Sequence, residues 1–244
     1  MRFLLGVSER SRLNSLTLEM LMAKIAFGKQ LLTSLNELVA PTHTALVVVD
    51  AQNDFCSTGG CLEQMPDSDM RLMKSFVHNT VTLVEAARKA GVLVIFTKAT
   101  NYPGGLYKSA PDLARKTEYL NPERPLICAA GTWGDDIIDD FKVSPGDIVL
   151  GKHRHNSFMG TELDVVLRSN AKQTVVVTGV TTERCVLATV AGAIAHDYYV
   201  VVPYDCVSSQ NVEMHKAALL VMSGNLMKDG VTESAKIVEC WAER

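Results

Sequence analysis

The sequence predicts an α/β fold: a doubly wound, mainly parallel six-stranded sheet with helices on both faces, in a Rossmann-like three-layer α/β/α arrangement. Short apolar runs recur without polar alternation, as in residues 44–49 and 174–178, and such runs are typical of strands buried on both faces. Helical segments separate these runs, which is the pattern of βαβ units with right-handed crossovers. The 244 residues, 47% of them hydrophobic, suffice for one large core.

The first half of the sheet is predicted from two apolar runs and the helix between them. Residues 44–49 read Thr-Ala-Leu-Val-Val-Val and form the first strand. A helix is expected over residues 69–90, because apolar residues recur there at helical spacing and Gly91 follows as a C-cap. Residues 92–96 form the second strand. A loop rich in proline and glycine is expected from residue 98 to about residue 125.

The second half continues the same alternation, with turn and capping residues marking its elements. Ser144-Pro-Gly146 is a turn signal before a strand, and Thr161 is the expected cap of a helix. Further strands are expected at residues 147–150, 174–178, 199–202 and 237–238, the last as an edge strand, and helices at residues 135–141, 161–169, 185–196 and 211–222.

The N-terminal segment differs from the rest of the chain. Residues 1–40 are expected to be a helical extension, and residues 41–244 a single α/β domain. Apolar residues at helical spacing between residues 16 and 38 predict one or two amphipathic helices that pack on the domain or on a partner subunit. Three arginines and a single acid among the first 17 residues leave a transit peptide open as an alternative.

Charge and composition exclude several classes of function. The net charge is −3, and the chain lacks the basic footprint of a nucleic-acid-binding protein. Its longest apolar runs are about six residues, far shorter than a membrane span. The six cysteines form no CxxC pair and match no zinc pattern, so a reducing, cytoplasmic location is expected, with no metal and no organic cofactor.

Three reactive side chains lie where predicted strands end. Asp50 follows the first strand, Lys152 follows the third, and Cys185 lies at the strand-to-helix junction after the fourth. The carboxyl ends of parallel strands share one edge of the sheet, where ligands bind in such folds, so these side chains are expected to meet. There a lysine favours a thiolate, and an aspartate can take the cysteine proton and return it.

Each of these residues also has an ordinary structural interpretation. An aspartate after a strand can cap a turn, a lysine there is usually a solvated charge, and most lone cysteines are buried packing residues. The position of Cys185 near a helix N-terminus, whose N–H groups favour a thiolate, argues for a functional thiol. Cys206, which also follows a strand, is the second candidate.

Two histidines follow Lys152. His153 and His155 are two residues apart, so in an extended segment they would share one side and could bind a metal. The sequence offers no third ligand nearby, and a structural role is the simpler interpretation.

Several motifs, in order, resemble those of the isochorismatase-like cysteine hydrolases. One is Asp50 with Gln52-Asn-Asp-Phe55 after it, and another is Lys152 before His155-Asn-Ser-Phe158. The most specific is Gly179-Val-Thr-Thr-Glu-Arg-Cys-Val186. The resemblance covers roughly residues 44–225 and identifies residues 41–244 as a domain of this family.

Finer motifs point to one branch of that family. Gly59-Gly-Cys-Leu62 and Gly131-Thr-Trp-Gly-Asp135 resemble the biuret, ureidoacrylate and N-carbamoyl amidohydrolases. Nicotinamidases of the family carry an Asp-x-His metal motif after the second strand. This chain has Lys98-Ala-Thr-Asn101 there, without a histidine, which argues against a metal-dependent nicotinamidase.

The resemblance implies a catalytic triad of Asp50, Lys152 and Cys185. It implies hydrolysis of a C–N bond in a small amide, ureido or carbamoyl compound through an acyl-cysteine intermediate. It also implies a cis peptide between Val180 and Thr181, which would aim the N–H groups of Thr181 and Cys185 at the oxyanion. The family's assemblies point to a homodimer or homotetramer, with a small-molecule substrate as the only ligand.

The substrate contacts are predicted from the loops. Phe55 and Trp133 are expected to wall the pocket and stack on a flat substrate, and Asn101 and Tyr107 to contact it from the long loop. Two other functions stay open. An isochorismatase-type vinyl-ether hydrolase need not use a cysteine, so the presence of Cys185 argues against it. A non-catalytic binding module on the same fold is the other.

Overall fold

A computed structural model describes residues 24–114 and 126–242. Its central sheet has seven strands in the order β5-β4-β3-β6-β7-β9, with β8 paired to β6, and every pair in it is parallel. The predicted α/β fold is confirmed, with one strand more than the six expected. The strands are β3 (Thr44–Val49), β4 (Leu93–Ala99), β5 (Ile148–Lys152), β6 (Thr174–Val180), β7 (Tyr199–Pro203), β8 (Val207–Ser208) and β9 (Val231–Thr232).

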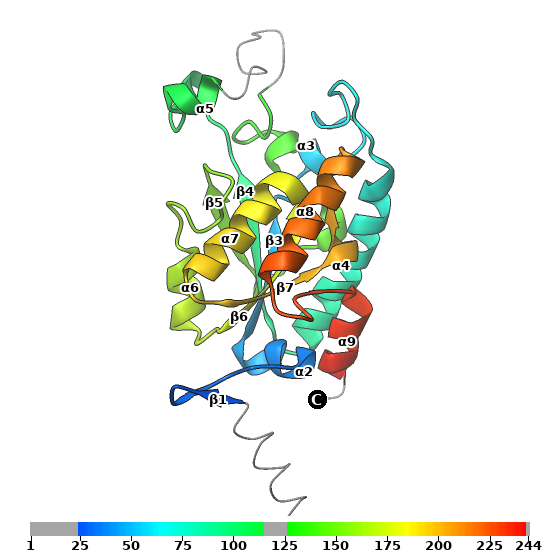
Figure 1. Ribbon diagram of the computed structural model, residues 1–244. Coiled ribbons are helices and arrows are strands. Elements are labelled where there is room, and N and C mark those ends of the chain that lie inside the picture. The colour runs from blue at the N-terminus through cyan, green and yellow to red at the C-terminus, as the bar shows by residue number, and fades with distance from the viewer. Residues whose placement is uncertain (1–23, 115–125, 243–244) are drawn as a thin grey trace, which may run out of the picture.

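Helices cover both faces of the sheet, which gives the three predicted layers (Figure 1). Successive residues of β3 point to opposite faces, and all six are buried. Leu46 and Val48 join the core under one set of helices, and Ala45 and Val47 join the core under the other. The first set is α2 (Leu35–Leu38), α4 (Arg71–Lys89) and α9 (Ser234–Ala242), and the second is α6 (Leu163–Ser169), α7 (Leu187–Ala195) and α8 (Val212–Asn225).

Three helix ends lie close to the positions predicted from their capping or turn residues. Gly91 follows α4 with a φ of 73°, the left-handed conformation expected after a helix C-terminus. Asn211 caps α8 by accepting a hydrogen bond from the N–H of Met214. The Thr161 hydroxyl accepts the N–H of Leu163, and α6 begins at Leu163, two residues later than predicted.

The predicted edge strand at residues 237–238 is wrong, because these residues lie in α9. Ile237 and Trp241 are one helical turn apart, and both are buried against the core under α4. Amphipathic helical spacing therefore decides the local structure over the β-branched pair. The edge strand is β9, at Val231–Thr232, which pairs with β7.

The single helix predicted at residues 135–141 is also wrong. The chain forms two 3₁₀ turns there, Trp133–Asp135 and Asp139–Phe141. Between them the backbone bonds to the segment after β3: the N–H of Asn53 donates to Asp136 O, and the N–H of Ile138 donates to Ala51 O. These tertiary hydrogen bonds hold the segment extended.

The helices predicted at residues 16–38 are only partly present among the described residues. A short hairpin of β1 (Ile25–Ala26) and β2 (Lys29–Gln30) takes the place of a helix there, and only α2 is helical. The turn Phe27-Gly28 has positive φ at both residues, which ends any helical run. Residues 1–23 lie outside the described residues, so the boundary at residue 40 stays a prediction.

The long loop after β4 contains a 3₁₀ turn at Pro103–Gly105 and a short helix, α5 (Ala110–Ala114). Figure 1 places α5 at the end of the molecule that also holds α3 (Asn53–Cys56). Residues 115–125 of the predicted loop lie outside the described residues.

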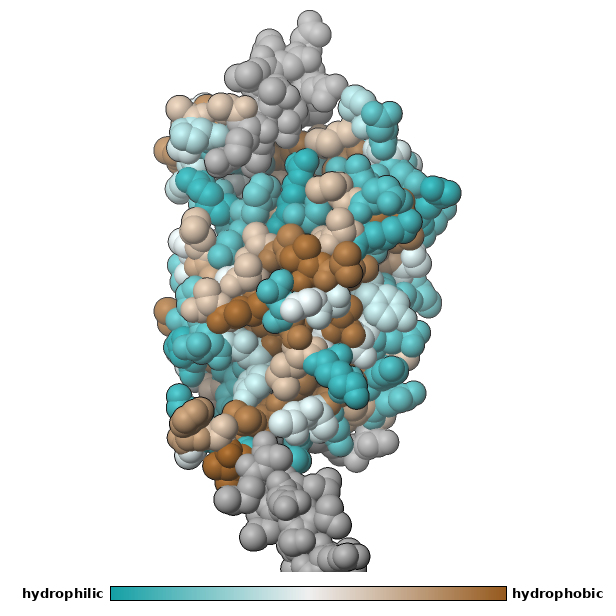
Figure 2. Space-filling model, in the orientation of Figure 1, coloured by the Kyte–Doolittle hydropathy of each residue, from teal (hydrophilic) through white to brown (hydrophobic). Residues whose placement is uncertain are grey.

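An apolar surface covers part of α7 and α8. Figure 2 shows hydrophobic residues gathered at the centre of the molecule. On these two helices Ile194, Leu220 and Val221 are 41%, 74% and 49% exposed. This surface supports the predicted homo-oligomer, which stays a prediction. Among the described residues, no helix is long and apolar enough to cross a membrane.

A close backbone approach between β3 and β6 gives a test of the fold. Gly179 has a φ of 118°, and a Cβ there would lie 2.0 Å from Val49 O. We expect Gly179→Ala to lower the free energy of unfolding by about 2–4 kcal/mol, because β3 and β6 would have to separate. Urea denaturation followed by circular dichroism measures the change.

Gly224→Ala is the matched control. Gly224 lies in α8 with no atom within 4 Å of the added methyl group, so we expect this variant to be more stable by about 0.5 kcal/mol. Equal unfolding midpoints for the two variants would contradict the packing argument.

Candidate active site

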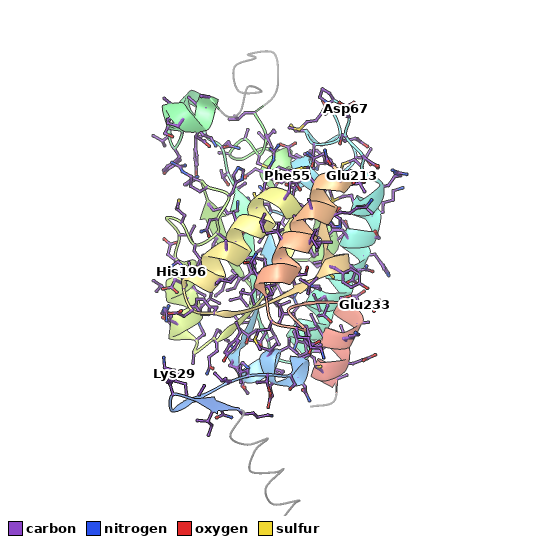
Figure 3. All side chains as sticks on the ribbon, viewed as in Figure 1. Lys29, Phe55, Asp67, His196, Glu213 and Glu233 are labelled. Carbon is purple, nitrogen blue, oxygen red and sulfur yellow. The ribbon has the colours of Figure 1, made fainter. Side chains whose placement is uncertain are left out.

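Three strands bring Asp50, Lys152 and Cys185 to one end of the sheet. Asp50 directly follows β3, and Lys152 is the last residue of β5. Cys185 lies in a π-helical turn, Thr182–Val186, that follows β6. Strand β4 separates β5 from β3, so only a side chain as long as lysine spans the gap. Figure 3 labels Phe55, of α3, at this end of the molecule.

A buried ion pair joins the first two residues. Lys152 Nζ lies 2.8 Å from Asp50 Oδ2, and the two side chains are 1% and 0% exposed. The ammonium also donates to the carbonyl oxygen of Arg154 at 2.9 Å. Burial disfavours the charge on Lys152, but the nearby Asp50 and Cys185 raise its pKa above the usual range. Lys152 is therefore a cation at neutral pH.

The Cys185 thiol completes the cluster in its protonated form. Its Sγ lies 3.5 Å from Lys152 Nζ. Burial, and then the charge of Asp50, raise the pKa of Cys185 to about 12, while Lys152 opposes the shift. Asp50 Oδ1 is buried and accepts no well-aligned hydrogen bond within the described part of the chain. The carboxylate therefore stands beside the thiol as an available proton acceptor.

Asp50 itself has a backbone conformation that few residues adopt. Its φ is 53°, and its N–H donates to Thr97 O at 2.9 Å. Aspartate and asparagine visit this left-handed region more readily than other non-glycine residues. The turn after β3 thus limits which residue can stand there.

A histidine contact that the sequence analysis did not identify reaches the same sulfur. His155 Nδ1 lies 3.3 Å from Cys185 Sγ. The signal was its place three residues after Lys152 within one motif. His153 turns elsewhere: its ring stacks on Tyr107 at 3.7 Å, and its Nδ1 contacts Thr100 O at 3.2 Å.

The two histidines diverge because residues 153–156 form bends and no strand. They do not form the metal pair considered from their spacing. Among the described residues, no three His, Cys, Asp or Glu side chains are grouped as metal ligands.

A cavity of about 140 Å³ opens beside Cys185. Two of the predicted substrate contacts, Phe55 and Asn101, line it. The other two lie outside its lining, with Tyr107 45% and Trp133 54% exposed, and their contact with substrate stays a prediction. The cavity is lined by Phe55, Leu62, Met65, Ala99, Thr100, Asn101, Lys108, Asp112, Ile127, Lys152, His153, Arg154, His155, Thr181, Arg184, Cys185 and Gln210.

The backbone at the expected oxyanion site has the cis peptide that the family resemblance implies. The peptide between Val180 and Thr181 is cis. Thr181 and Cys185 line the same cavity, and Thr181 O accepts the N–H groups of Arg184 and Val186, which holds the turn closed. The use of the Thr181 and Cys185 amides as an oxyanion hole stays a prediction.

Three cationic side chains that the sequence analysis did not single out also line the cavity: Lys108, Arg154 and Arg184. Arg154 Nη1 donates to the carbonyl oxygens of Tyr107 and His153, which fixes this guanidinium. The Arg184 side chain is 55% exposed, and its Nε lies 3.9 Å from Glu183 Oε1. The signal for Arg184 was its position directly before Cys185.

Cys206, the second candidate nucleophile, lies elsewhere. It is fully buried in the core under α4 and does not line the cavity. Burial raises the pKa of its thiol to about 12 as well, so what distinguishes Cys185 is its contact with Lys152 and its place on the cavity.

The chain matches one protein family over most of its length. A family model described as the Isochorismatase domain matches residues 44–233. Ureidoacrylate amidohydrolase RutB of Enterobacter sp. (strain 638) is 34% identical over 192 residues, which cover 74% of this chain and 82% of that protein. The protein of the same name from Pantoea ananatis is 35% identical over 191 residues, which cover 74% of this chain and 75% of that protein.

Solved structures share the fold. A cysteine hydrolase from Pseudomonas syringae pv. phaseolicola superimposes with a TM-score of 0.70 at 21% identity, over 83% of this chain and 94% of that one. N-carbamoylsarcosine amidase from Thermoplasma acidophilum gives a TM-score of 0.61 at 29% identity, over 78% of this chain and 96% of that one.

The electrostatics of the cluster predict how the pKa of the Cys185 thiol responds to each neighbour. Asp50 raises this pKa and Lys152 lowers it. We therefore expect Asp50→Asn to move the pKa below about 12 and Lys152→Met to move it further up. Asparagine tolerates the positive φ of Asp50. The rate of alkylation of Cys185 by iodoacetamide against pH, followed by mass spectrometry, reports the pKa.

Asp67→Asn is the matched control, because Asp67 also has a positive φ, of 59°, but is exposed (Figure 3). Its alkylation profile should equal that of the wild type. An Asp50→Asn profile that stays in place or moves to higher pH would contradict the arrangement of charges.

Proposed function

Because the chain belongs to the isochorismatase family of hydrolases, we propose that it hydrolyses a C–N bond in a small ureido or carbamoyl compound, with Cys185 as the nucleophile. The observation that carries the proposal is the buried cluster of Asp50, Lys152 and Cys185, of which Lys152 and Cys185 line a cavity. Similarity to enzymes named ureidoacrylate amidohydrolase supports the choice of bond.

Acylation begins with a neutral thiol. Asp50 takes the proton of Cys185, and Sγ forms a bond to the substrate carbonyl carbon. The N–H groups of Thr181 and Cys185 hold the oxyanion of the tetrahedral intermediate. When the intermediate collapses, the C–N bond breaks, and Asp50 passes its proton to the departing nitrogen, which leaves as ammonia or an amine. Lys152 keeps Asp50 in place and offsets the negative charge throughout.

Deacylation uses the same groups in reverse. Asp50, now a carboxylate again, takes a proton from water while the water oxygen attacks the acyl carbon. The second tetrahedral intermediate releases Sγ with the electrons of the C–S bond. The sulfur regains a proton from Asp50, and the acyl group leaves as a carboxylic or carbamic acid.

The cations at the cavity favour a substrate that also carries a carboxylate. Lys108, Arg154 and Arg184 line the cavity together with Lys152. Lys108 is paired with Asp112 at 3.3 Å, whereas the Arg184 guanidinium makes only a 3.9 Å ion pair among the described residues. Guanidinium groups bind carboxylates with two parallel hydrogen bonds. We propose that Arg184 binds this carboxylate.

The proposed reaction also bears on the cellular location and the oligomeric state of the enzyme. We propose a cytoplasmic enzyme, since an acyl-cysteine mechanism needs a reduced thiol. We further propose a homodimer or homotetramer, with the apolar surface of α7 and α8 as the contact. The substrate is a small molecule, and no cofactor takes part in the proposed steps.

Ammonia release from a panel of small amides tests the reaction and the nucleophile together. The panel holds ureidoacrylate, biuret, N-carbamoyl amino acids, nicotinamide and maleamate. We expect Cys185→Ala to lower kcat by about 10³-fold or more on every substrate that the wild type cleaves. Cys206→Ala is the control, because Cys206 lies outside the cavity, and it should keep the wild-type rate.

Ammonia release that survives in Cys185→Ala would remove this thiol from the mechanism. If the wild type releases no ammonia from any compound of the panel but cleaves a vinyl ether such as isochorismate, the result would favour an isochorismatase-type vinyl-ether hydrolase.

The role of Arg184 predicts a selective change in KM. We expect Arg184→Gln to raise KM about 10-fold for an anionic substrate, because one charge-assisted contact is lost. KM for the neutral amide biuret should change less than about twofold by the same argument. Lys216→Gln, which removes an exposed cation of α8, is the control for net charge. An equal rise in KM for both substrates would argue against carboxylate binding.

A further inference from the structure

A histidine outside the proposed triad contacts the reactive sulfur. His155 lies in the bend between β5 and α6, and its Nδ1 is 3.3 Å from Cys185 Sγ. Both residues line the cavity. The mechanism described above gives this imidazole no role, although its nitrogen is as near to the sulfur as Lys152 Nζ is, at 3.5 Å.

The available hydrogens decide the direction of this contact. The thiol has one proton to donate, and both the charge of Asp50 and a side-chain hydrogen bond to it raise the pKa of Cys185, which makes this carboxylate the acceptor of that proton. The sulfur therefore meets Lys152 and His155 through its lone pairs. Lys152 can only donate. A contact between Nδ1 and a sulfur lone pair likewise requires the hydrogen on Nδ1.

We propose that His155 is a further catalytic residue, whose Nδ1–H donates a hydrogen bond to Cys185 Sγ and stabilises negative charge on that sulfur. The inference rests on the proposed function. The N–H bond stays intact throughout, while Asp50 accepts and returns the thiol proton. The contact strengthens at two points: when Sγ attacks the carbonyl carbon, and when the C–S bond breaks and its electron pair returns to Sγ.

The hydrogen bond from His155 contributes most at the second of these points, when the C–S bond breaks. A thiol of raised pKa is a poor leaving group, because a basic sulfur leaves an acyl carbon slowly. Two N–H donors to the sulfur, from Lys152 and His155, offset this disadvantage during deacylation. In the absence of the His155 donor, the acyl-enzyme should accumulate.

The neighbouring His153 does not share this role. Its ring is stacked on Tyr107, and its Nδ1 contacts Thr100 O, at the wall of the cavity. The charged groups around the sulfur are Asp50 from the end of β3 and Lys152 from β5. Arg184, on the same turn as Cys185, lines the cavity as well.

A pair of substitutions at His155 separates the hydrogen-bond donor from the bulk of the ring. His155→Leu removes the donor and keeps an apolar side chain of moderate size. His155→Asn keeps an N–H near the position of Nδ1–H. His78→Gln, at an exposed position on α4, is the control for loss of a histidine. The readouts are the pH profile of Cys185 alkylation by iodoacetamide, kcat, and the fraction of acyl-enzyme by mass spectrometry.

We expect His155→Leu to shift the alkylation profile to higher pH by about one unit, which is about a tenfold slower reaction at fixed pH. Its kcat should fall about 10-fold or more, with acyl-enzyme accumulating during turnover. His155→Asn should restore most of both, and His78→Gln should match the wild type. A wild-type profile for His155→Leu, or an equal defect in the Leu and Asn variants, would overturn the proposal.

The alkylation profile needs no substrate. If no compound of the panel is cleaved, the proposed reaction fails, while the profile still decides whether His155 stabilises the sulfur anion.

Discussion

The buried ion pair between Lys152 and Asp50 is the constraint on which the rest of the site depends. Its two charges lie 2.8 Å apart with 1% and 0% of their side chains exposed. Removing such groups from water costs several kcal/mol for each ion, and only a close partner and further hydrogen bonds offset that cost. Each charge therefore requires the other. The ends of β3 and β5 must therefore hold one relative position, and this position also fixes Lys152 Nζ against the Cys185 thiol.

The sheet supplies that rigidity through close backbone contact. β3 lies between β4 and β6, and its last residue, Val49, pairs with both Thr97 and Gly179. The absence of a side chain at Gly179 lets β6 approach, and the N–H of Asp50 continues the ladder by donating to Thr97 O. The same ladder that closes the core thus sets the place of the carboxylate. A site built on strand ends is more exact than one built on loops alone.

This dependence explains how much of the molecule the sequence could predict. Asp50, Lys152 and Cys185 could be placed together because strand order and the parallel rule decide which ends meet. The contact of His155 with the sulfur could not, because it depends on the path of an irregular bend. Tertiary packing also decided the elements that were wrong: Ile237 faces the core from a helix, and the backbone of residues 136–138 bonds to the segment after β3. Helix and strand propensities depend on neighbours in the sequence and therefore do not predict such tertiary partners.

The resting proton distribution has a chemical consequence for the proposed mechanism. A thiol whose pKa lies near 12 is almost entirely protonated at neutral pH, and a protonated thiol reacts slowly with oxidants and stray electrophiles. Nucleophilicity then arises only as Asp50 takes the proton while the carbonyl carbon is in reach. The same burial makes the sulfur a poor leaving group, so the cluster needs donors that act on the anion and not on the thiol. Lys152 is fixed by its ion pair, and His155 is the remaining N–H group in contact with Sγ among the described contacts. Burial of the Cys185 thiol thus has two consequences: it protects the resting nucleophile, and it creates the need for a hydrogen-bond donor when the C–S bond breaks.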